Sequence, residues 1–256
     1  MADRPLRDGK AWTRDELIIA FELYCRTPFR KTKAGNPEVR RIAHLLERTP
    51  ASVARKLGNF GAFDPQLRQA GISGLKHGSR LDREVWEEFH RDWNSLVLAA
   101  YQLRRSIGEP GDESDAFMPP SGPSERQRLS RERIHQSFFR AAILSGYDAR
   151  CCITGISIPE CLVASHIVPW SCNEGLRTDP SNGLCLSATF DRLFDAGLIT
   201  IERELTVKAS PRLRSSQDRP VSTLIACYHG KPISRPARFL PSEDHLAWHR
   251  ANIFQA

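Results

Sequence analysis

The sequence predicts an α+β protein with a helical N-terminal domain followed by a C-terminal domain of short strands, loops and helices. Apolar residues recur at helical spacing through roughly the first hundred residues. Residues 107–125 are rich in Pro, Gly, Ser and acids, a composition typical of a flexible linker. Further along, the apolar runs become short and are separated by turn residues. We therefore expect a basic helical domain over 1–106, a linker over 107–125 and a second domain over 126–256.

Composition narrows the class of protein. The chain has 256 residues, of which 40% are hydrophobic and 26% charged, as in ordinary globular proteins. No apolar run reaches the roughly 18 residues that span a membrane, and the N-terminus has no apolar core like that of a signal peptide. The seven cysteines are odd in number and form no C-x-x-C pair, which favours neither a disulfide framework nor a structural zinc site. We expect a cytoplasmic protein that is not bound to a membrane.

Positive charge is concentrated in the first part of the chain. Residues 1–107 account for the whole net charge of +7, because they hold 20 Lys/Arg and 13 Asp/Glu. The remainder of the chain holds 17 of each. Within residues 26–80 there are 12 basic and 3 acidic side chains. A basic excess confined to one stretch suggests an anionic partner, with nucleic acid the first candidate. A basic surface that only keeps the protein soluble explains the charge equally well.

Capping signals define the N-terminal helices. Thr13 precedes an apolar-periodic run with Glu16 three residues on, which is a capping-box pattern. A second helix is expected from Pro37. Thr49 is the expected N-cap of a third helix that has Pro50 at its first position, a favoured place for proline.

The second and third helices resemble a helix-turn-helix unit, in which the second helix often enters the DNA major groove. The third helix would present Arg55 and Lys56, beside Arg48 in the turn, to DNA. A helical bundle used for packing or for protein contacts is the alternative, because this geometry is also common in domains that bind no DNA. One further helix is expected over 82–105.

The C-terminal domain is expected to mix helices and strands. Its predicted elements are a helix over 125–146, strands over 151–155, 162–167, 184–186 and 198–201, a helix over 188–196, a pairing of 221–228 with the segment from Ile233, and a last helix after Ser242.

Polar residues in this domain form a pattern that suggests chemistry. His166 ends an apolar strand, and Asn182 follows 16 residues later in a turn. Asp191 and Asp195 stand four apart on one short helix, so both carboxylates face the same way. A lone histidine on a strand is more often structural, and two acids on a helix surface need no ligand. A shared cation would, however, remove the repulsion between these carboxylates.

Hydrolysis of a phosphodiester requires what these residues could supply. An imidazole with a reference pKa of about 6.5 can deprotonate water near neutral pH. A hard divalent cation held by carboxylate oxygens stabilises charge on the phosphate and on the leaving oxygen. The amide of Asn182 could tie the intervening loop to the strand and fix where His166 points.

The stretch from about 126 to 202 resembles the HNH (ββα-metal) endonuclease superfamily. The combined spacing of several motifs carries the resemblance, and the matching segments are Phe139-Arg140, Tyr147, Cys152-Ile153-Thr154-Gly155, Ala164-Ser165-His166-Ile167-Val168-Pro169-Trp170, Asp179-Pro180-Ser181-Asn182-Gly183-Leu184 and Phe190-Asp191-Arg192-Leu193-Phe194-Asp195-Ala196-Gly197-Leu198-Ile199. The tail, with Leu246-Ala247-Trp248-His249-Arg250, also resembles relatives of this branch.

The resemblance implies a role for each matching residue. His166 matches the general base, and Asn182 matches the asparagine that orders the loop. Asp191 and Asp195 fall at metal-binding positions for one Mg²⁺ or Mn²⁺. Ser165 stands where many members carry a metal-binding Asp or His, so the metal site is short of one usual ligand.

The resemblance also implies a partner and a biological setting. The expected function is metal-dependent cleavage of DNA, with restriction or phage defence as the setting and modified bases as one kind of target. Arg140 and Arg192 could contact phosphate or pair with acids. A double-strand cut by one active site per chain would favour a homodimer. The alternative is a catalytically inactive DNA-binding regulator that kept the fold.

Overall fold

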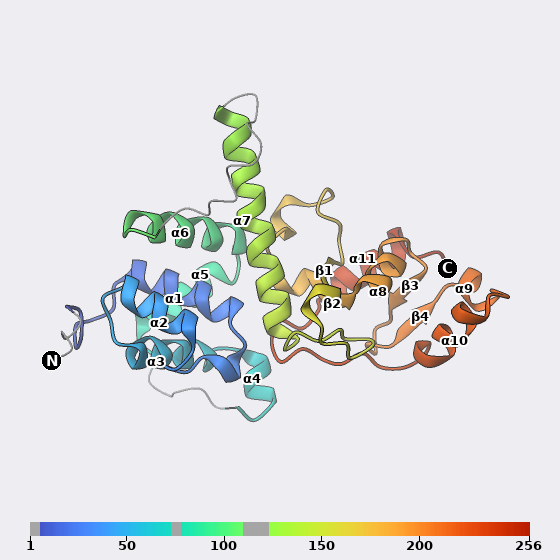
Figure 1. Cartoon of the computed structure of the whole chain (residues 1–256), viewed down its shortest axis with the longest axis horizontal. Coiled ribbons are helices and arrows are strands. Elements are labelled where there is room, and N and C mark those ends of the chain that lie inside the picture. The colour runs from blue at the N-terminus through green and yellow to red at the C-terminus, as the bar shows by residue number, and fades with distance from the viewer. Residues whose placement is uncertain (1–5, 73–77, 110–122) are drawn as a thin grey trace. The chain divides into compact units, whose positions relative to one another are not determined.

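A computed structural model of the chain describes residues 6–72, 78–109 and 123–256 (Figure 1). The chain divides into two compact units, Met1–Ser145 and Gly146–Ala256. Most of the expected linker, 107–125, lies outside the described residues, and its last three positions belong to a helix. The functional boundaries expected at 106 and 126 stay a prediction.

The first unit is helical and is built around its first helix. Its elements are α1 (Arg14–Arg26), the short 3-10 helix η1 (Phe29–Lys31), α2 (Pro37–Leu45), α3 (Pro50–Gly61), α4 (Pro65–Gln69), α5 (Arg80–Phe89), α6 (Trp93–Ser106) and α7 (Pro123–Gly146). Helix α1 packs against α2, α3, α5 and α6. The Phe21 ring of α1 lies 5.0 Å from the Phe60 ring and 5.1 Å from the Trp86 ring. An aromatic core therefore joins three helices.

The capping signals in the sequence are confirmed. Thr13 accepts a hydrogen bond from the backbone of Glu16, whose side chain bonds back to the Thr13 backbone. Thr49 caps α3 through Ser52, with Pro50 at the first position of the helix. Each bond satisfies an N–H group that a helix start leaves without an intrahelical partner.

The prediction of a single helix over 82–105 is wrong. The structure has two helices, α5 and α6, separated by a turn at residues 90–92. Asp92 is the N-cap of α6 and accepts the Ser95 backbone N–H at 3.0 Å. Aspartate competes for local backbone donors in this way, which makes it a poor helix-interior residue and a good cap.

The second unit combines two small antiparallel sheets with helices. Its elements are the 3-10 helix η3 (Pro159–Cys161), β1 (Leu162–His166), η4 (Glu174–Leu176), η5 (Pro180–Asn182), β2 (Gly183–Ser187), α8 (Ala188–Asp195), β3 (Ile199–Ile201), β4 (Val207–Ala209), α9 (Pro211–Arg214), α10 (Arg219–Tyr228) and α11 (Glu243–Asn252). Strand β1 pairs with β2, and β3 pairs with β4. The α+β class is therefore confirmed, as are the strands and the helix expected between 162 and 201.

The predictions of strands over 151–155 and 221–228 are wrong. Residues 151–155 form a turn, closed by a hydrogen bond from the Gly155 N–H to the Cys151 carbonyl. Residues 219–228 form α10, so they do not pair as a strand with the segment from Ile233. In α10, Val221, Leu224, Ile225 and Tyr228 stand at helical spacing, and a proline occupies the first turn, where it is tolerated.

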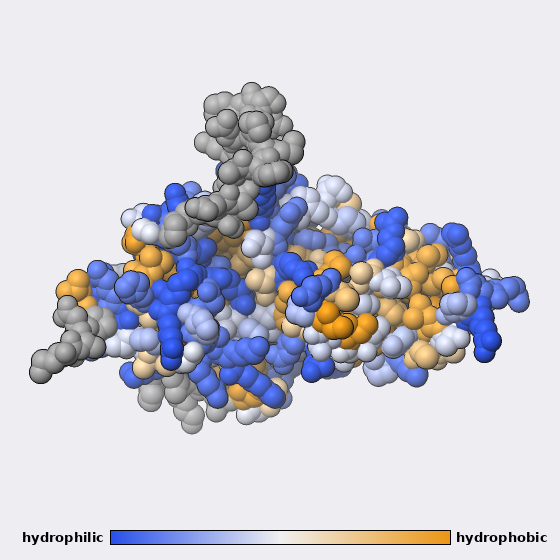
Figure 2. Space-filling view, viewed as in Figure 1, coloured by the Kyte–Doolittle hydropathy of each residue, from blue (hydrophilic) through white to orange (hydrophobic). Residues whose placement is uncertain are grey.

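None of the described helices is long and apolar enough to cross a membrane. The visible face of the helical unit is largely hydrophilic (Figure 2). None of the seven cysteines forms a disulfide.

Candidate nuclease site

The candidate site is built on β1, β2 and α8. The two strands pair in an antiparallel register that sets His166 opposite Gly183 and Leu162 opposite Ser187. Helix α8 follows β2 directly, with Ser187 as its N-cap residue, and packs against both strands. Strands β1 and β2 form a hairpin, and the loop 167–182 connects them. This loop therefore begins directly after His166, the last residue of β1.

His166 is held at the end of β1 by the backbone of that loop. Its Nε2 lies 3.0 Å from the carbonyl oxygen of Arg177. Because a carbonyl oxygen only accepts, Nε2 carries the hydrogen and, in the neutral ring, Nδ1 carries the lone pair. Burial lowers the pKa of His166 below 6.5, and the hydrogen bond to the Arg177 carbonyl opposes part of that shift. The imidazole is therefore neutral at pH 7.

Asn182 ties the two ends of the loop together. It is fully buried, and its side chain exchanges two hydrogen bonds with the backbone of Val168: the Val168 N–H donates to Oδ1 at 2.8 Å, and Nδ2 donates to the Val168 carbonyl at 3.0 Å. Nδ2 also lies 3.4 Å from the Leu176 carbonyl. The Ile167 N–H donates to the Asn182 carbonyl at 2.9 Å. The structure thus forms the loop tie that the sequence suggested for this amide.

Trp170 and Arg177 support the histidine, and sequence reasoning missed the role of Arg177. The ring centroids of His166 and Trp170 lie 5.6 Å apart with an interplanar angle of 83°. The Arg177 guanidinium lies 4.9 Å from the Trp170 ring centroid, and its Nε donates to the Trp170 carbonyl at 3.3 Å. Arg177 also pairs with Glu174 at 3.2 Å. The bond to His166 uses a backbone carbonyl, which no side-chain motif reveals.

Asp191 and Asp195 lie one turn apart on α8, as expected. The pKa of Asp195 is raised, first by burial and then by the negative charge of Asp191, while Arg192 lowers it. The two carboxylates are therefore close enough to repel each other. Among the described residues, no group of three or more His, Cys, Asp or Glu side chains is arranged to hold a metal. Two carboxylates are what α8 alone can offer.

Ser165 is buried next to the histidine. Its side chain is only 3% exposed, and its hydroxyl has no hydrogen-bond partner among the residues that the structure describes. A buried hydroxyl without a partner costs free energy, which an additional ligand or water could recover.

Arg48, expected to contact DNA, lies inside the helical unit instead. Its side chain is 2% exposed and pairs with Glu16 at 2.9 Å. The guanidinium also donates to three backbone carbonyls between residues 7 and 11 and lies 4.3 Å from the Trp12 ring centroid. With its donors used in this way, Arg48 holds the N-terminal segment against α1, which argues against the expected DNA contact.

Lys56 is also turned inward, whereas the other three expected cations are exposed. Lys56 pairs with the fully buried carboxylate of Asp82 at 2.9 Å, which argues against a DNA contact there as well. Arg55 is exposed on α3. Arg140, on α7, and Arg192, on α8, are exposed too, and they belong to different units.

A second histidine fixes the far end of α8. His249 of α11 is buried, and its Nε2 lies 3.1 Å from the Phe194 carbonyl while its Nδ1 lies 2.9 Å from the Thr200 hydroxyl. The His249 ring stacks on the Phe194 ring at 3.7 Å. Burial lowers the pKa of His249 to about 4. The sequence pointed to this tail only through its resemblance, since the contacts join residues 49 and 55 positions apart.

Residues 151–202 match the model of the HNH endonuclease family HNH_2. This segment contains β1, β2 and α8 with all five residues expected at the catalytic and metal positions, so the C-terminal unit carries an HNH endonuclease domain. The family is one of nucleases.

Among solved structures, the chain is similar to a protein described as a modification-dependent TagI restriction endonuclease. The sequences are 22% identical, the TM-score is 0.33, and the matched part covers 45% of this chain and 37% of that chain. The chain thus corresponds to little more than a third of that protein's length. No curated protein matches the chain.

Proposed function

We propose that this protein is a metal-dependent DNA endonuclease in which His166 is the general base. The placement of His166 carries the proposal. Its Nε2 is bound to the Arg177 carbonyl, and burial keeps the ring neutral at pH 7. The ring therefore presents a basic Nδ1 at the pH where a cytoplasmic enzyme works.

In the proposed reaction, Nδ1 of His166 accepts a proton from water as the water oxygen forms a bond to phosphorus. The bond from phosphorus to the leaving oxygen breaks, and the leaving oxygen takes a proton from solvent water, giving a terminal phosphate and a hydroxyl. The resulting imidazolium donates to the Arg177 carbonyl through Nε2, a hydrogen bond that favours the charged ring. Asn182 keeps this carbonyl in place by joining Val168 to Leu176.

Asp191 and Asp195 would hold the metal ion, which fits their mutual repulsion on α8. Carboxylate oxygens suit Mg²⁺ or Mn²⁺, and the unpartnered hydroxyl of Ser165 is a further oxygen for the same site. When bound, such an ion would stabilise negative charge on the phosphate and on the leaving oxygen. Two carboxylates are a usual number for Mg²⁺, which commonly keeps several waters and binds substrate phosphates.

The remaining parts of the proposal concern the setting of the reaction. The helical domain over 1–106 would bind DNA, and the domain over 126–256 would cut it. We propose a restriction or phage-defence role in the cytoplasm, where free thiols are the rule. Cleavage of both strands by one active site per chain would favour a homodimer.

A plasmid cleavage assay tests the proposal. Wild-type protein should cut in the presence of Mg²⁺ or Mn²⁺ and not in EDTA, on a panel of modified and unmodified DNA. His166→Ala should lower the cleavage rate by at least about a hundredfold, the usual minimum for loss of a general base. The matched control is His229→Ala, an exposed histidine on another element that should leave cleavage unchanged. Equal rates for the wild type and His166→Ala would remove His166 as the base.

Asp191→Ala should abolish metal-dependent cleavage while leaving DNA binding largely intact, and Glu204→Ala is its exposed acidic control. If the wild type binds DNA but leaves every substrate intact, the protein is a non-catalytic DNA-binding regulator. Unchanged cleavage by Asp191→Ala would exclude this carboxylate from the metal site.

A further inference from the structure

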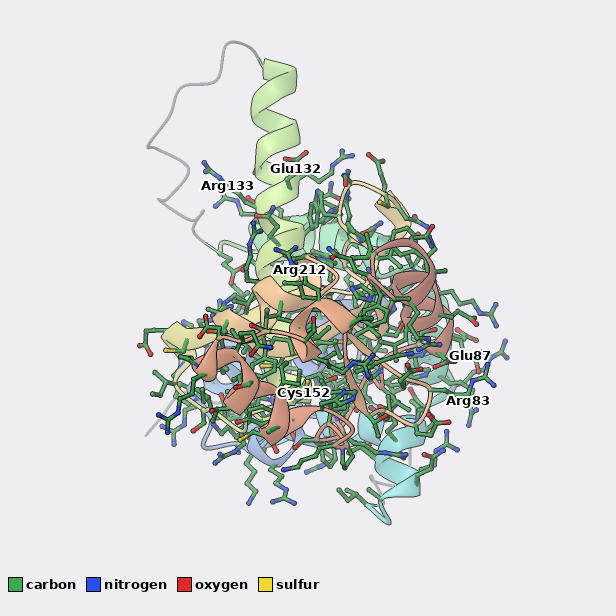
Figure 3. The ribbon with its side chains drawn as sticks, turned by 90° about the vertical axis from the view of Figure 1, so that its right-hand side faces the viewer. Arg83, Glu87, Glu132, Arg133, Cys152 and Arg212 are labelled. Carbon is green, nitrogen blue, oxygen red and sulfur yellow. The ribbon has the colours of Figure 1, made fainter. Side chains whose placement is uncertain are left out.

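The cations of the helical unit divide into two groups according to their partners. In the first group, acidic side chains of the same unit pair with each cation. Examples are Arg14 with Glu88 at 2.6 Å and the exposed Arg83 with Glu87 at 4.0 Å, whose side chains extend side by side from α5 (Figure 3). Further members of the group are Arg7, Arg26, Arg41, Arg48, Lys56, Arg80 and Arg104. Their charge is largely neutralised locally.

The second group is concentrated between α1 and α3. Within the part of the chain that the structure describes, the exposed side chains of Arg30, Lys31, Lys33, Arg40 and Arg55 form no ion pair. Three of them lie within four residues of each other, in η1 and the turn that follows. We call residues 30–33 the basic loop. Lys10, Arg68, Arg91 and Arg105 are also exposed and form no described ion pair, but they are scattered along the chain, whereas the basic loop brings three such cations together.

Hydrogen bonds hold the basic loop in one conformation. The Thr32 hydroxyl donates to the Phe29 carbonyl at 2.7 Å, and Nδ2 of Asn36 donates to the Lys31 carbonyl at 3.0 Å. The Asn36 N–H donates to the Lys33 carbonyl at 2.9 Å. These bonds fix the backbone at both ends of the loop. Its cations are thus pre-organised, which reduces the entropy that binding an anion would cost.

Phe29 connects the basic loop to α3. Its ring lies against Gly61, where an added Cβ would come within 2.3 Å of it. The solvent side of α3 carries small residues, with Ala51 exposed and Ser52 and Ala54 partly exposed around Arg55. Small side chains let an extended partner approach the helix closely, and the neighbouring cations favour an anionic one.

We propose that the basic loop, with Arg55 of α3, binds the phosphate backbone of duplex DNA. The proposal rests on DNA being the substrate of the nuclease domain. The sequence had pointed to Arg48 and Lys56 as DNA contacts, but their charges are paired with acids inside the unit. The proposed contacts are instead cations that form no described ion pair. Contacts of this kind position DNA without reading its sequence.

The test is the salt dependence of DNA binding, measured by fluorescence anisotropy with a labelled 20-base-pair duplex in EDTA, so that no cleavage is needed. The variant is Arg30→Ala/Lys31→Ala/Lys33→Ala. Its matched control is Lys10→Ala/Arg91→Ala/Arg105→Ala, which removes the same charge from three other exposed positions of the unit. Since none of the three loop side chains forms a described hydrogen bond, the variant should melt at the wild-type temperature.

Each phosphate contact contributes about 0.9 to the slope of log affinity against log salt concentration. The loop variant should lose up to about 2.7 of that slope, and the control less than about 0.9. Between 50 and 200 mM salt, wild-type affinity should therefore fall about 40-fold more steeply than that of the loop variant.

Equal slopes for the two triple variants would overturn the proposal, because only net charge would then matter. Absence of DNA binding by the wild type would overturn it too. Failure of the nuclease proposal looks different: the loop would still set the salt slope, while the wild type would cut no DNA with Mg²⁺ or Mn²⁺ supplied.

Discussion

Replacement of Asn182 by alanine should show how strongly the loop around His166 depends on one amide. Asn182 is fully buried and makes three side-chain hydrogen bonds to the loop backbone. Its removal would leave the buried N–H of Val168 without an acceptor, at a cost of about 1–3 kcal/mol. Loss of the bonds to two carbonyls adds a smaller amount, so we expect a local destabilisation of about 2–4 kcal/mol.

Hydrogen exchange measured by mass spectrometry on the full-length protein can detect this change in the loop itself. Peptides that cover residues 167–181 should exchange about 30- to 700-fold faster in Asn182→Ala than in the wild type, the factor to which 2–4 kcal/mol corresponds. Cleavage should also slow, because the Arg177 carbonyl that orients His166 belongs to the same loop.

Asn173→Ala is the matched control for this experiment. Asn173 lies in the same loop, is exposed, and accepts one hydrogen bond from the Gly175 N–H at 2.9 Å. Its loss should cost about 1 kcal/mol or less, as for an ordinary exposed cap. If both variants accelerate exchange equally, Asn182 does not hold the loop, and the explanation of how His166 is oriented fails.

Three further changes test other contacts. Ser165→Asp should add a carboxylate beside Asp191 and Asp195, so Mn²⁺ should raise the melting temperature of this variant more than that of Ser165→Ala; equal shifts would place residue 165 outside the metal site. Gly61→Ala should destabilise the helical unit by about 1–3 kcal/mol by displacing the Phe29 ring, whereas Gly35→Ala, with open space around its Cβ, should cost less than that in thermal unfolding. The pKa of His249 is about 4 in the folded state, against about 6.5 unfolded, so the unfolded chain takes up the proton first as pH falls. Urea unfolding should therefore show a loss of about 2 kcal/mol between pH 7 and pH 5 that is absent in His249→Gln, and the same loss in that variant would contradict the assignment.

Local signals in the sequence predicted much of this fold because the interactions behind them are local. The Thr13 capping box and the Thr49 cap each join residues three apart, and both form as expected. The β1–β2–α8 unit was also predictable, since its two strands are bounded by turn residues. Asn182 could be assigned to the loop because its partner Val168 lies only 14 positions away.

The segment 221–228 shows where such signals fail. Its Val, Thr and Ile residues favour a strand by propensity, while its apolar positions also fit a helix. The structure forms α10, and Tyr228 packs edge-on against Phe190 of α8 at 5.1 Å. A contact between residues 38 positions apart in the sequence decides against propensity here, as tertiary packing often does.

Charge pairing explains why the burial of Arg48 and Lys56, two cations expected to contact DNA, could not be predicted from the sequence. Arg48 and Lys56 pair with acids 32 and 26 positions away, so their burial cannot be read from neighbouring residues. A count of charges along the chain treats these two cations and those of the basic loop alike. Folding separates them, because burying a cation requires a partner, and the acids available to Arg48 and Lys56 lie on α1 and α5. Cations left without such partners stay at the surface, where, under the proposed function, they can pair with the phosphate backbone of DNA.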